Sequence, residues 1–310
     1  ALAVPLRRLD GSSASWARLE LVGSAPFGDF VRQHVLKPQG ATAGAKPRET
    51  PQVFDFSIWQ QCADVLADEV AIPKWFATDL FSLASARMQP VTGSASPTLF
   101  LAAGGTASGL HVDFLQTHFW MGLCSGRKRW RLVPPEDLAL LRPTYLADLN
   151  PAFPADLDDE APAELARGGQ LSVLEHVLEP GDVIFVPRGW PHQVENLETS
   201  VAISANFIDA SNLGAARAEA EALGLASEDP WLLAGVLREA EGGGLLEQLA
   251  RSATGSHEPL REFKARHGEP KPPQEAQRKV LWVAAASAMA VGALLCAAAA
   301  RALRGSAPAG

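Results

Sequence analysis

The chain has 310 residues, of which 47% are hydrophobic and 20% charged, and its formal net charge at pH 7 is −8. This length and apolar content suffice for one substantial folded domain with appended segments, and the acidic balance argues against a general nucleic-acid-binding protein. The three cysteines, Cys62, Cys124 and Cys296, are far apart and form no CxxC pair. They indicate neither a disulfide scaffold nor a cysteine zinc site, and they are compatible with a reducing compartment.

Five segments are expected along the chain from composition and apolar periodicity. The second is expected to be mostly helical, with its clearest helix from Ile58 to Ala71 and a stop before Pro73. Short apolar strands separated by Gly and Pro turns follow, and then an Ala- and Glu-rich helical stretch. The expected boundaries are 1–50 for a variable N-terminal segment, 51–96 for the helical segment, 97–213 for the strand-rich core, 214–279 for a helical extension and linker, and 280–300 for a hydrophobic helix.

The strand-rich segment favours a fold that is mainly β with helices. Several short strands with Gly and Pro turns fit a double-stranded β-helix, a cupin-like jelly roll, with flanking helices and a C-terminal hydrophobic helix. In the stretch 199–207, Val201 and Phe207 belong to an apolar face, while Ser204 and Asn206 fall on the other. A strand with polar groups on its second face either meets solvent or lines a pocket.

A candidate metal site is the most informative feature of the sequence. If Leu110 to Phe114 is a strand, His111 and Asp113 point to the same side, with α-carbons about 6 to 7 Å apart. A Pro-Gly turn, an apolar strand and a Gly-Trp-Pro bend then deliver His192. Two imidazoles and one carboxylate hold Fe(II) by one face and leave positions for an oxidisable cosubstrate and O2. The alternative is a chance HxD triplet without a metal.

Lys128 is the second candidate site residue. In the stretch 127–133, three arginines share one strand face and leave Lys128 on the apolar face beside Trp130 and Leu132. An inward lysine needs an anionic partner, because an unpaired buried charge costs several kcal/mol. The alternative is that Lys128 lies at the strand end and reaches water.

At this point the sequence resembles the Jumonji-C (JmjC) branch of Fe(II)- and 2-oxoglutarate-dependent oxygenases, roughly from Pro51 to Leu213. Within it, the motif spacing is most similar to the bifunctional arginine demethylase and lysyl-hydroxylase (phosphatidylserine-receptor-like) subgroup. The segments that carry the resemblance are IPKWF at 72–76, DLF at 79–81, GLHVD at 109–113, GRKRWRLVPP at 126–135, PGDVIFVPRGWPH at 180–192 and NLETSVAISANF at 196–207.

The resemblance implies roles for individual residues. His111, Asp113 and His192 correspond to the iron ligands, and Lys128 to the residue that binds the distal carboxylate of 2-oxoglutarate. Further cosubstrate-pocket positions correspond to Ser108, Ser204 and Asn206. One departure is Met121, where the subgroup has an asparagine that hydrogen-bonds the cosubstrate, because a thioether cannot donate a hydrogen bond. His118 is either a further pocket residue or a structural histidine.

The implied function is a dioxygenase that uses Fe(II), 2-oxoglutarate and O2 to hydroxylate a protein side chain, or to N-demethylate it through hydroxylation, with Lys or methyl-Arg as the expected target. The alternatives are a small-molecule hydroxylase and a catalytically impaired JmjC-like binding module, for which Met121 is the main hint. We expect a protein or peptide substrate and no specific nucleic acid. The acidic stretch 156–160 with Glu164 is either an attractor for a basic peptide or a solvated loop.

Residues 280–300 carry no charge and are bounded by basic residues. As a helix they would be about 30 Å long, which matches the hydrocarbon core of a bilayer. We therefore expect a single-pass membrane protein, anchored near its C-terminus, with its catalytic domain in the cytosol. A buried or partner-bound helix is the alternative.

Overall fold

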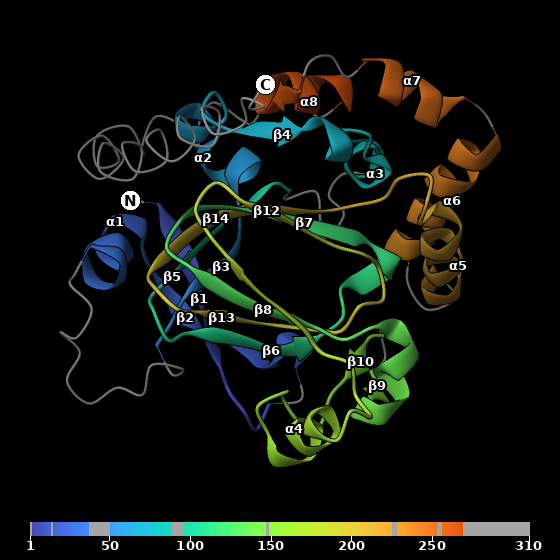
Figure 1. Cartoon of the computed structure of the whole chain (residues 1–310). Helices are drawn as coiled ribbons and strands as arrows, with labels where there is room; N and C mark the ends of the chain where they lie inside the picture. The colour runs from blue at the N-terminus through green and yellow to red at the C-terminus, as the bar shows by residue number, and fades with distance from the viewer. Residues whose placement is uncertain are drawn as a thin grey trace, which may run out of the picture.

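The core of the computed structural model consists of two facing antiparallel sheets (Figure 1). One sheet has the order β12-β7-β14-β5-β3 and the other the order β11-β8-β13-β6. Their strands are β3 (Val53–Ser57), β5 (Thr98–Ala102), β6 (Ala107–His111), β7 (His118–Ser125), β8 (Lys128–Leu132), β11 (Leu174–Leu178), β12 (Val183–Val186), β13 (His192–Asn196) and β14 (Ser200–Phe207). The structure describes residues 2–13, 15–36, 50–88, 96–146, 149–224, 228–242, 244–252 and 256–268. This mainly β architecture is consistent with the expected jelly roll.

Side-chain alternation along the strands separates the space between the sheets from the outside. On β14, Val201 and Phe207 pack in the cluster beneath the covering helices, whereas Ala202 belongs to the cluster between the sheets. On β8, Lys128 and Trp130 are only 3% and 1% exposed. The period of two predicted for both strands is thereby confirmed, and the polar positions of β14 face inward.

Helices cover the outer face of the five-stranded sheet. Phe76 stacks on Trp120 of that sheet, with ring centroids 5.4 Å apart and planes at 7°. The covering elements are α2 (Ile58–Leu66), the 3-10 turn Lys74–Phe76 and α8 (Leu260–Arg266). A second helical cluster is formed by α3 (Leu80–Met88), α5 (Leu213–Gly224), α6 (Glu228–Gly242) and α7 (Leu245–Ser252). Both groups bury apolar surface outside the space between the sheets.

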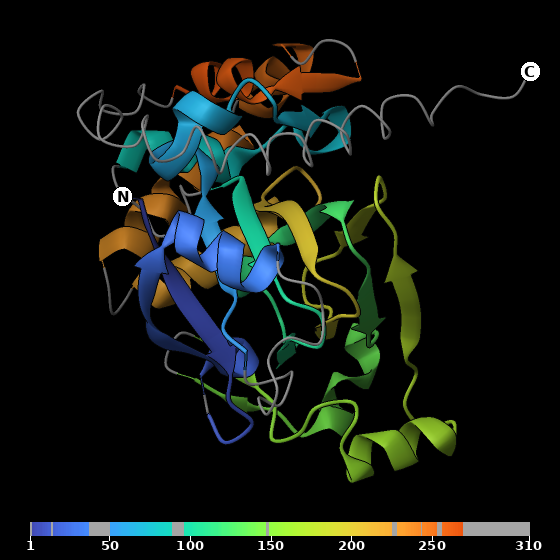
Figure 2. The same ribbon diagram turned by 90° about the vertical axis from the view of Figure 1, so that its left-hand side faces the viewer.

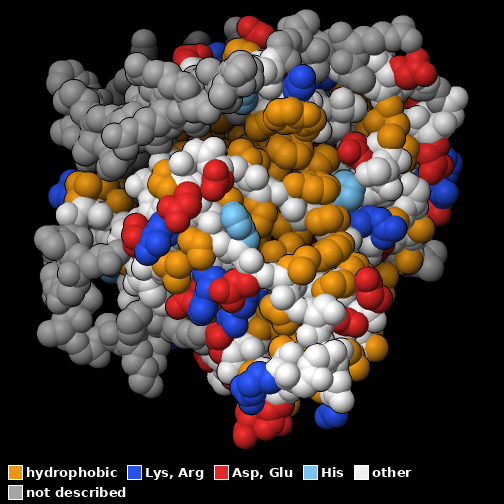
Figure 3. Space-filling view, in the orientation of Figure 1, with side chains coloured by type: hydrophobic (Ala, Val, Ile, Leu, Met, Phe, Trp, Pro, Cys, Tyr) orange, Lys and Arg blue, Asp and Glu red, His pale blue; other side chains and the backbone are white. Residues whose placement is uncertain are grey.

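Two smaller elements flank the core (Figures 1 and 2). An N-terminal hairpin of β1 (Ala3–Leu9) and β2 (Leu19–Pro26) joins β3 through a bridge between Arg7 and Gln52. At the other end lie β9 (Thr144–Tyr145), β10 (Pro151–Ala152) and α4 (Glu160–Arg167). Hydrophobic side chains gather across the middle of the face shown in Figure 3.

Several expected element boundaries were wrong. The helix that begins at Ile58 ends at Leu66, and residues 71–73 instead form β4 (Ala71–Pro73), which pairs with β15 (His257–Pro259). Local periodicity could not reveal a partner strand more than 180 residues away. Likewise, the strand expected over 110–114 ends at His111, and Phe114–Gln116 is a 3-10 turn.

The expected membrane span also requires correction. Among the described residues, no helix combines the length and the apolar character needed to cross a bilayer. Residues 280–300, on which the expectation was based, lie outside the described part of the chain. That expectation used the absence of charge in an alanine-rich stretch, and alanine adds little to membrane insertion. Neither the C-terminal hydrophobic helix nor the single-pass topology with a cytosolic catalytic domain is retained.

The turn between β7 and β8, which links the two sheets, depends on Gly126. Its φ is +82°, and a Cβ there would lie 2.3 Å from the Thr199 carbonyl oxygen. Gly169 has a similar φ of +71° but open space around it. We predict that Gly126→Ala lowers the free energy of unfolding by roughly 3 kcal/mol or more and Gly169→Ala by about 1 kcal/mol, measured by urea denaturation. Equal losses would contradict a steric role for the Gly126 turn.

Candidate functional site

His111, Asp113 and His192 converge at one end of the space between the sheets. Their potential ligand atoms all lie within 4.8 Å of one another, and all three residues are buried. His111 and His192 stand opposite each other in the register of β6 and β13, with ring centroids 4.2 Å apart. Asp113 follows the end of β6 but keeps an extended backbone, with φ −69° and ψ 147°. The side-chain alternation therefore continues past the strand end.

The backbone fixes which nitrogen of each histidine is available. Nδ1 of His111 lies 2.7 Å from the Gly109 carbonyl oxygen, and Nδ1 of His192 lies 3.0 Å from the Trp190 carbonyl oxygen. Because a carbonyl oxygen only accepts, each Nδ1 must carry the proton, which leaves the Nε2 lone pair free. Burial, with a further contribution from His192, holds the pKa of His111 well below its usual value. A neutral imidazole is the form that binds a metal.

Asp113 completes a donor set that fits a divalent transition metal. Burial raises the pKa of its carboxyl, although His192 and a hydrogen bond from Asn206 act in the opposite direction. A buried carboxylate without a full counter-charge is costly, and a bound cation would remove that cost. Two imidazole nitrogens and one carboxylate oxygen match the set that binds Fe(II) on one face.

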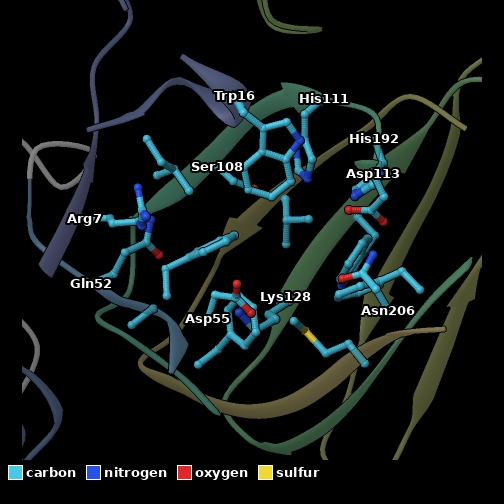
Figure 4. Close-up of a pocket in the computed structure, with 18 of the residues that line it drawn as sticks. Arg7, Trp16, Gln52, Asp55, Ser108, His111, Asp113, Lys128, His192 and Asn206 are labelled. Carbon is cyan, nitrogen blue, oxygen red and sulfur yellow. The ribbon is translucent and has the colours of Figure 1, made fainter. Parts of the chain in front are cut away.

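A cavity of about 410 Å³ extends from the triad between the two sheets (Figure 4). Its walls are largely aromatic and apolar, with contributions from Trp16, Phe54, Phe100, Phe119 and Trp130. Among the described residues, the charged ones that line it, apart from the triad, are Arg7, Asp55 and Lys128. Such an apolar pocket with a few convergent polar groups is the usual form of a small-molecule site.

Lys128 faces this cavity and does not reach bulk water, since it is only 3% exposed. Its Nζ donates a hydrogen bond of 2.5 Å to Oδ1 of Asn196, whose amide nitrogen donates to the carbonyl and hydroxyl oxygens of Thr106. Burial lowers the pKa of Lys128 to about 7, and no described carboxylate contributes to that shift. The ammonium therefore lacks an anionic partner in the described protein, which leaves it available for an anion in the cavity.

The remaining predicted site residues divide between the cavity and its surroundings. Ser108, Asn206 and Met121 line the cavity. Ser204 is buried, with its hydroxyl 3.2 Å from that of Thr98, and it is not among the cavity-lining residues. His118 accepts a hydrogen bond from the Arg188 backbone and contacts the Ser211 hydroxyl. These contacts confirm the structural interpretation of His118.

The N-terminal segment supplies cavity residues that the sequence did not indicate. The Trp16 ring meets His111 edge-to-face, with centroids 4.6 Å apart, and its Nε1 donates to the Val112 carbonyl oxygen. Arg7, Gln52 and Asp55 also line the cavity. No motif marks these four residues. The β1–β2 hairpin and the Arg7–Gln52 bridge bring Arg7, Trp16 and Gln52 to the site, and the irregular pairing of β3 with β5 brings Asp55.

Two carboxylates of the acidic stretch at 156–160 serve the fold. Asp156 is buried, accepts the Leu110 backbone N–H and lies 3.5 Å from Arg18. Asp158 accepts two hydrogen bonds of 2.7 Å from the Arg131 guanidinium. Asp156 and Asp158 are thus engaged within the chain, whereas Asp159, Glu160 and Glu164 are exposed to solvent. The solvated interpretation holds for these three residues, and attraction of a basic peptide stays a prediction.

Comparison with known proteins identifies the family of the chain. The family model described as "Cupin-like domain" matches residues 22–212, more than half of the chain. The chain belongs to this cupin-like family. Relatives include arginine-specific demethylase JMJ22 of Arabidopsis thaliana (28% identity over 66% of this chain and 41% of the relative) and 2-oxoglutarate and iron-dependent oxygenase JMJD4 of Mus musculus (28% over 50% and 36%). Another is bifunctional arginine demethylase and lysyl-hydroxylase psr-1 of Caenorhabditis elegans (29% over 48% and 37%). The JmjC resemblance is confirmed, and the matched region spans about two fifths of these relatives' lengths.

The buried ammonium of Lys128 predicts a specific pH dependence of stability. Because its pKa in the folded protein, about 7, lies below the ordinary value of 10.5 for a lysine, the unfolded chain binds the proton more strongly between these pH values. The free energy of unfolding contributed by this group therefore rises as pH increases from 7 to 10.5. We predict that Lys128→Met is more stable than wild type at pH 7 and that its advantage shrinks toward pH 10, in urea denaturation at several pH values.

Lys74→Met is the matched control, because Lys74 is exposed. That variant should differ from wild type by the same small amount at every pH. A stability difference for Lys128→Met that does not change with pH would show that the ammonium is not desolvated.

Proposed function

We propose that this chain is an Fe(II)- and 2-oxoglutarate-dependent dioxygenase that hydroxylates a protein side chain, or N-demethylates it through hydroxylation, with Lys or methyl-Arg as the target. Its core is assigned to the double-stranded β-helix. One observation carries this proposal. Two Nε2 lone pairs and the Asp113 carboxylate converge at one end of a cavity that also contains the Lys128 ammonium, which has no anionic partner among the described residues.

The roles of the residues follow from their positions. His111, Asp113 and His192 would hold Fe(II), and Lys128 would bind the distal carboxylate of 2-oxoglutarate, with Ser108 nearby in the same cavity. When bound, these groups supply the oxidising chemistry: 2-oxoglutarate, O2 and a substrate C–H are converted to succinate, CO2 and a substrate C–OH. Asn196 orients the Lys128 ammonium, and Asn206 hydrogen-bonds Asp113. Trp16 and Trp130 pack on the histidine rings and keep water from them.

Ser204 is proposed as a more distant contributor. Its hydroxyl pairs with Thr98 behind the cavity wall, so a direct bond to the cosubstrate carboxylate would require a rotamer change. The Ser204 hydroxyl would then exchange its Thr98 partner for the charged carboxylate of the cosubstrate.

The same site serves hydroxylation and demethylation. A hydroxylated N-methyl group collapses to formaldehyde and the free amine, whereas a hydroxylated chain carbon is retained. The relatives whose names include arginine demethylase and lysyl-hydroxylase support a protein or peptide substrate with a nitrogen-containing side chain. Only the placement of the substrate carbon relative to the metal distinguishes the two outcomes.

One observation favours a second candidate. Met121 lines the cavity, where the most similar subgroup has an asparagine, so one hydrogen-bond donor for the cosubstrate is missing. This favours a binding module of impaired catalysis as the alternative function.

Succinate formation tests the proposal. Purified protein with Fe(II), 2-oxoglutarate and O2 is expected to release succinate above a protein-free control, even without a substrate. His192→Ala should lose both iron retention and succinate formation while its circular dichroism stays unchanged. Lys128→Ala should retain iron and bind 2-oxoglutarate at least about tenfold more weakly, because a charge-assisted hydrogen bond is lost. Cosubstrate binding without any succinate would support the binding module instead.

A separate prediction concerns the departure at position 121. Met121→Asn restores an amide donor inside the cavity, and we expect it to lower the dissociation constant for 2-oxoglutarate by roughly threefold to tenfold, measured by calorimetry without O2. Met121→Leu, which adds no donor, is the control. If Asn and Leu have the same effect, this side chain does not contact the cosubstrate.

A further inference from the structure

Asp55 enters the cavity from an irregular point of β3. The register between β3 and β5 shifts between Val53 and Phe56, and Asp55 has a φ of +60°. A bulge of this kind re-aims a side chain that regular alternation would send elsewhere. Aspartate is among the few non-glycine residues that tolerate positive φ, but the conformation still has a cost. The result is a carboxyl group directed into the cavity (Figure 4).

The hydrogen bonds of Asp55 leave most of its acceptor capacity unused. It accepts one side-chain hydrogen bond from Thr98, and an ionised carboxylate has about four lone-pair positions. The residue is exposed in the structure and lines the cavity, yet the surrounding protein raises the pKa of its carboxyl by desolvation. Its remaining lone pairs therefore face a space in which a ligand can lie.

The two cavity cations do not neutralise Asp55. Lys128 is bonded to Asn196 and does not contribute to the pKa of Asp55. Arg7 also lowers the pKa of Asp55, but less than the hydrogen bond from Thr98 does. No ion pair within 4.0 Å joins Arg7 to Asp55 among the described residues. This part of the cavity therefore favours a cation.

We propose that Asp55 is a substrate-specificity residue, whose carboxylate binds the ammonium or guanidinium group of the substrate inside the cavity. This inference rests on the proposed function, because the group that enters is taken to be the side chain that is oxidised. A substrate cation would supply the missing donors and would hold the carboxylate ionised. The bulge in β3 then places near the triad a carboxylate that is not a metal ligand.

Equilibrium binding in the absence of O2 tests the inference without any turnover. Two peptide pools with randomised flanks differ only in the central residue, lysine in one and norleucine in the other. A second pair has monomethylarginine and citrulline. Immobilised protein with Fe(II) and 2-oxoglutarate is incubated with each pair, and retained peptides are quantified by mass spectrometry. Wild type is expected to retain the cationic member over the neutral one by about tenfold or more.

Two cavity variants should move this preference in opposite directions. Asp55→Asn keeps the size, the tolerance of positive φ and an oxygen that can accept from Thr98, so it should fold and should lose the preference. Arg7→Gln removes a competing positive charge and should increase it. Glu160→Gln, at an exposed position on α4, should match wild type.

Equal retention of cationic and neutral peptides by wild type, or an unchanged preference in Asp55→Asn, would overturn the inference. Failure of the proposed function would instead appear as absent succinate formation. Because the peptide measurement needs no turnover, the two failures are distinguishable.

Discussion

The site depends on the direct antiparallel pairing of β6 with β13, which sets His111 opposite His192. Each ring is fixed by a hydrogen bond from its Nδ1 to a carbonyl oxygen two residues earlier in the chain. This local anchor selects the tautomer and turns both Nε2 atoms toward the same point. Asp113 follows His111 by two residues of extended backbone. The pairing of β6 with β13 and the end of β6 therefore position all three donor residues.

Around this pairing, the protein buries charges that it does not neutralise itself. Lys128 and Asp113 both have pKa values displaced by burial, in the directions that favour their neutral forms. Both shifts indicate a loss of stability in the protein without ligands, because burial is unfavourable for each charged group. An anion at Lys128 and a cation at Asp113 would relieve both costs. We therefore expect that binding an anion at Lys128 and a cation at Asp113 recovers the stability lost at these positions.

The sequence predicted the site best where local spacing decides the geometry. His111 and Asp113 are two residues apart, and the alternation in 127–133 was enough to place Lys128 between the sheets. His192 was identified from its own turn, strand and bend, although it lies far along the chain, but other features that depend on a distant segment were missed. The strand at 71–73 exists because of its pairing with 257–259, and Trp16 reaches His111 across 95 positions of sequence. Asp55 depends on a bulge that no local pattern announces, and the buried Asp156 resembles a solvated residue until Arg18 is placed beside it.

The position of the metal is the most direct test of the account. Crystals grown without O2 in the presence of Fe(II) would be measured on both sides of the iron absorption edge, and the anomalous difference map would locate the ion. The account predicts a single peak within bonding distance of His111 Nε2, His192 Nε2 and a carboxylate oxygen of Asp113. A peak that contacts fewer than these three residues, or that lies elsewhere in the cavity, would contradict it.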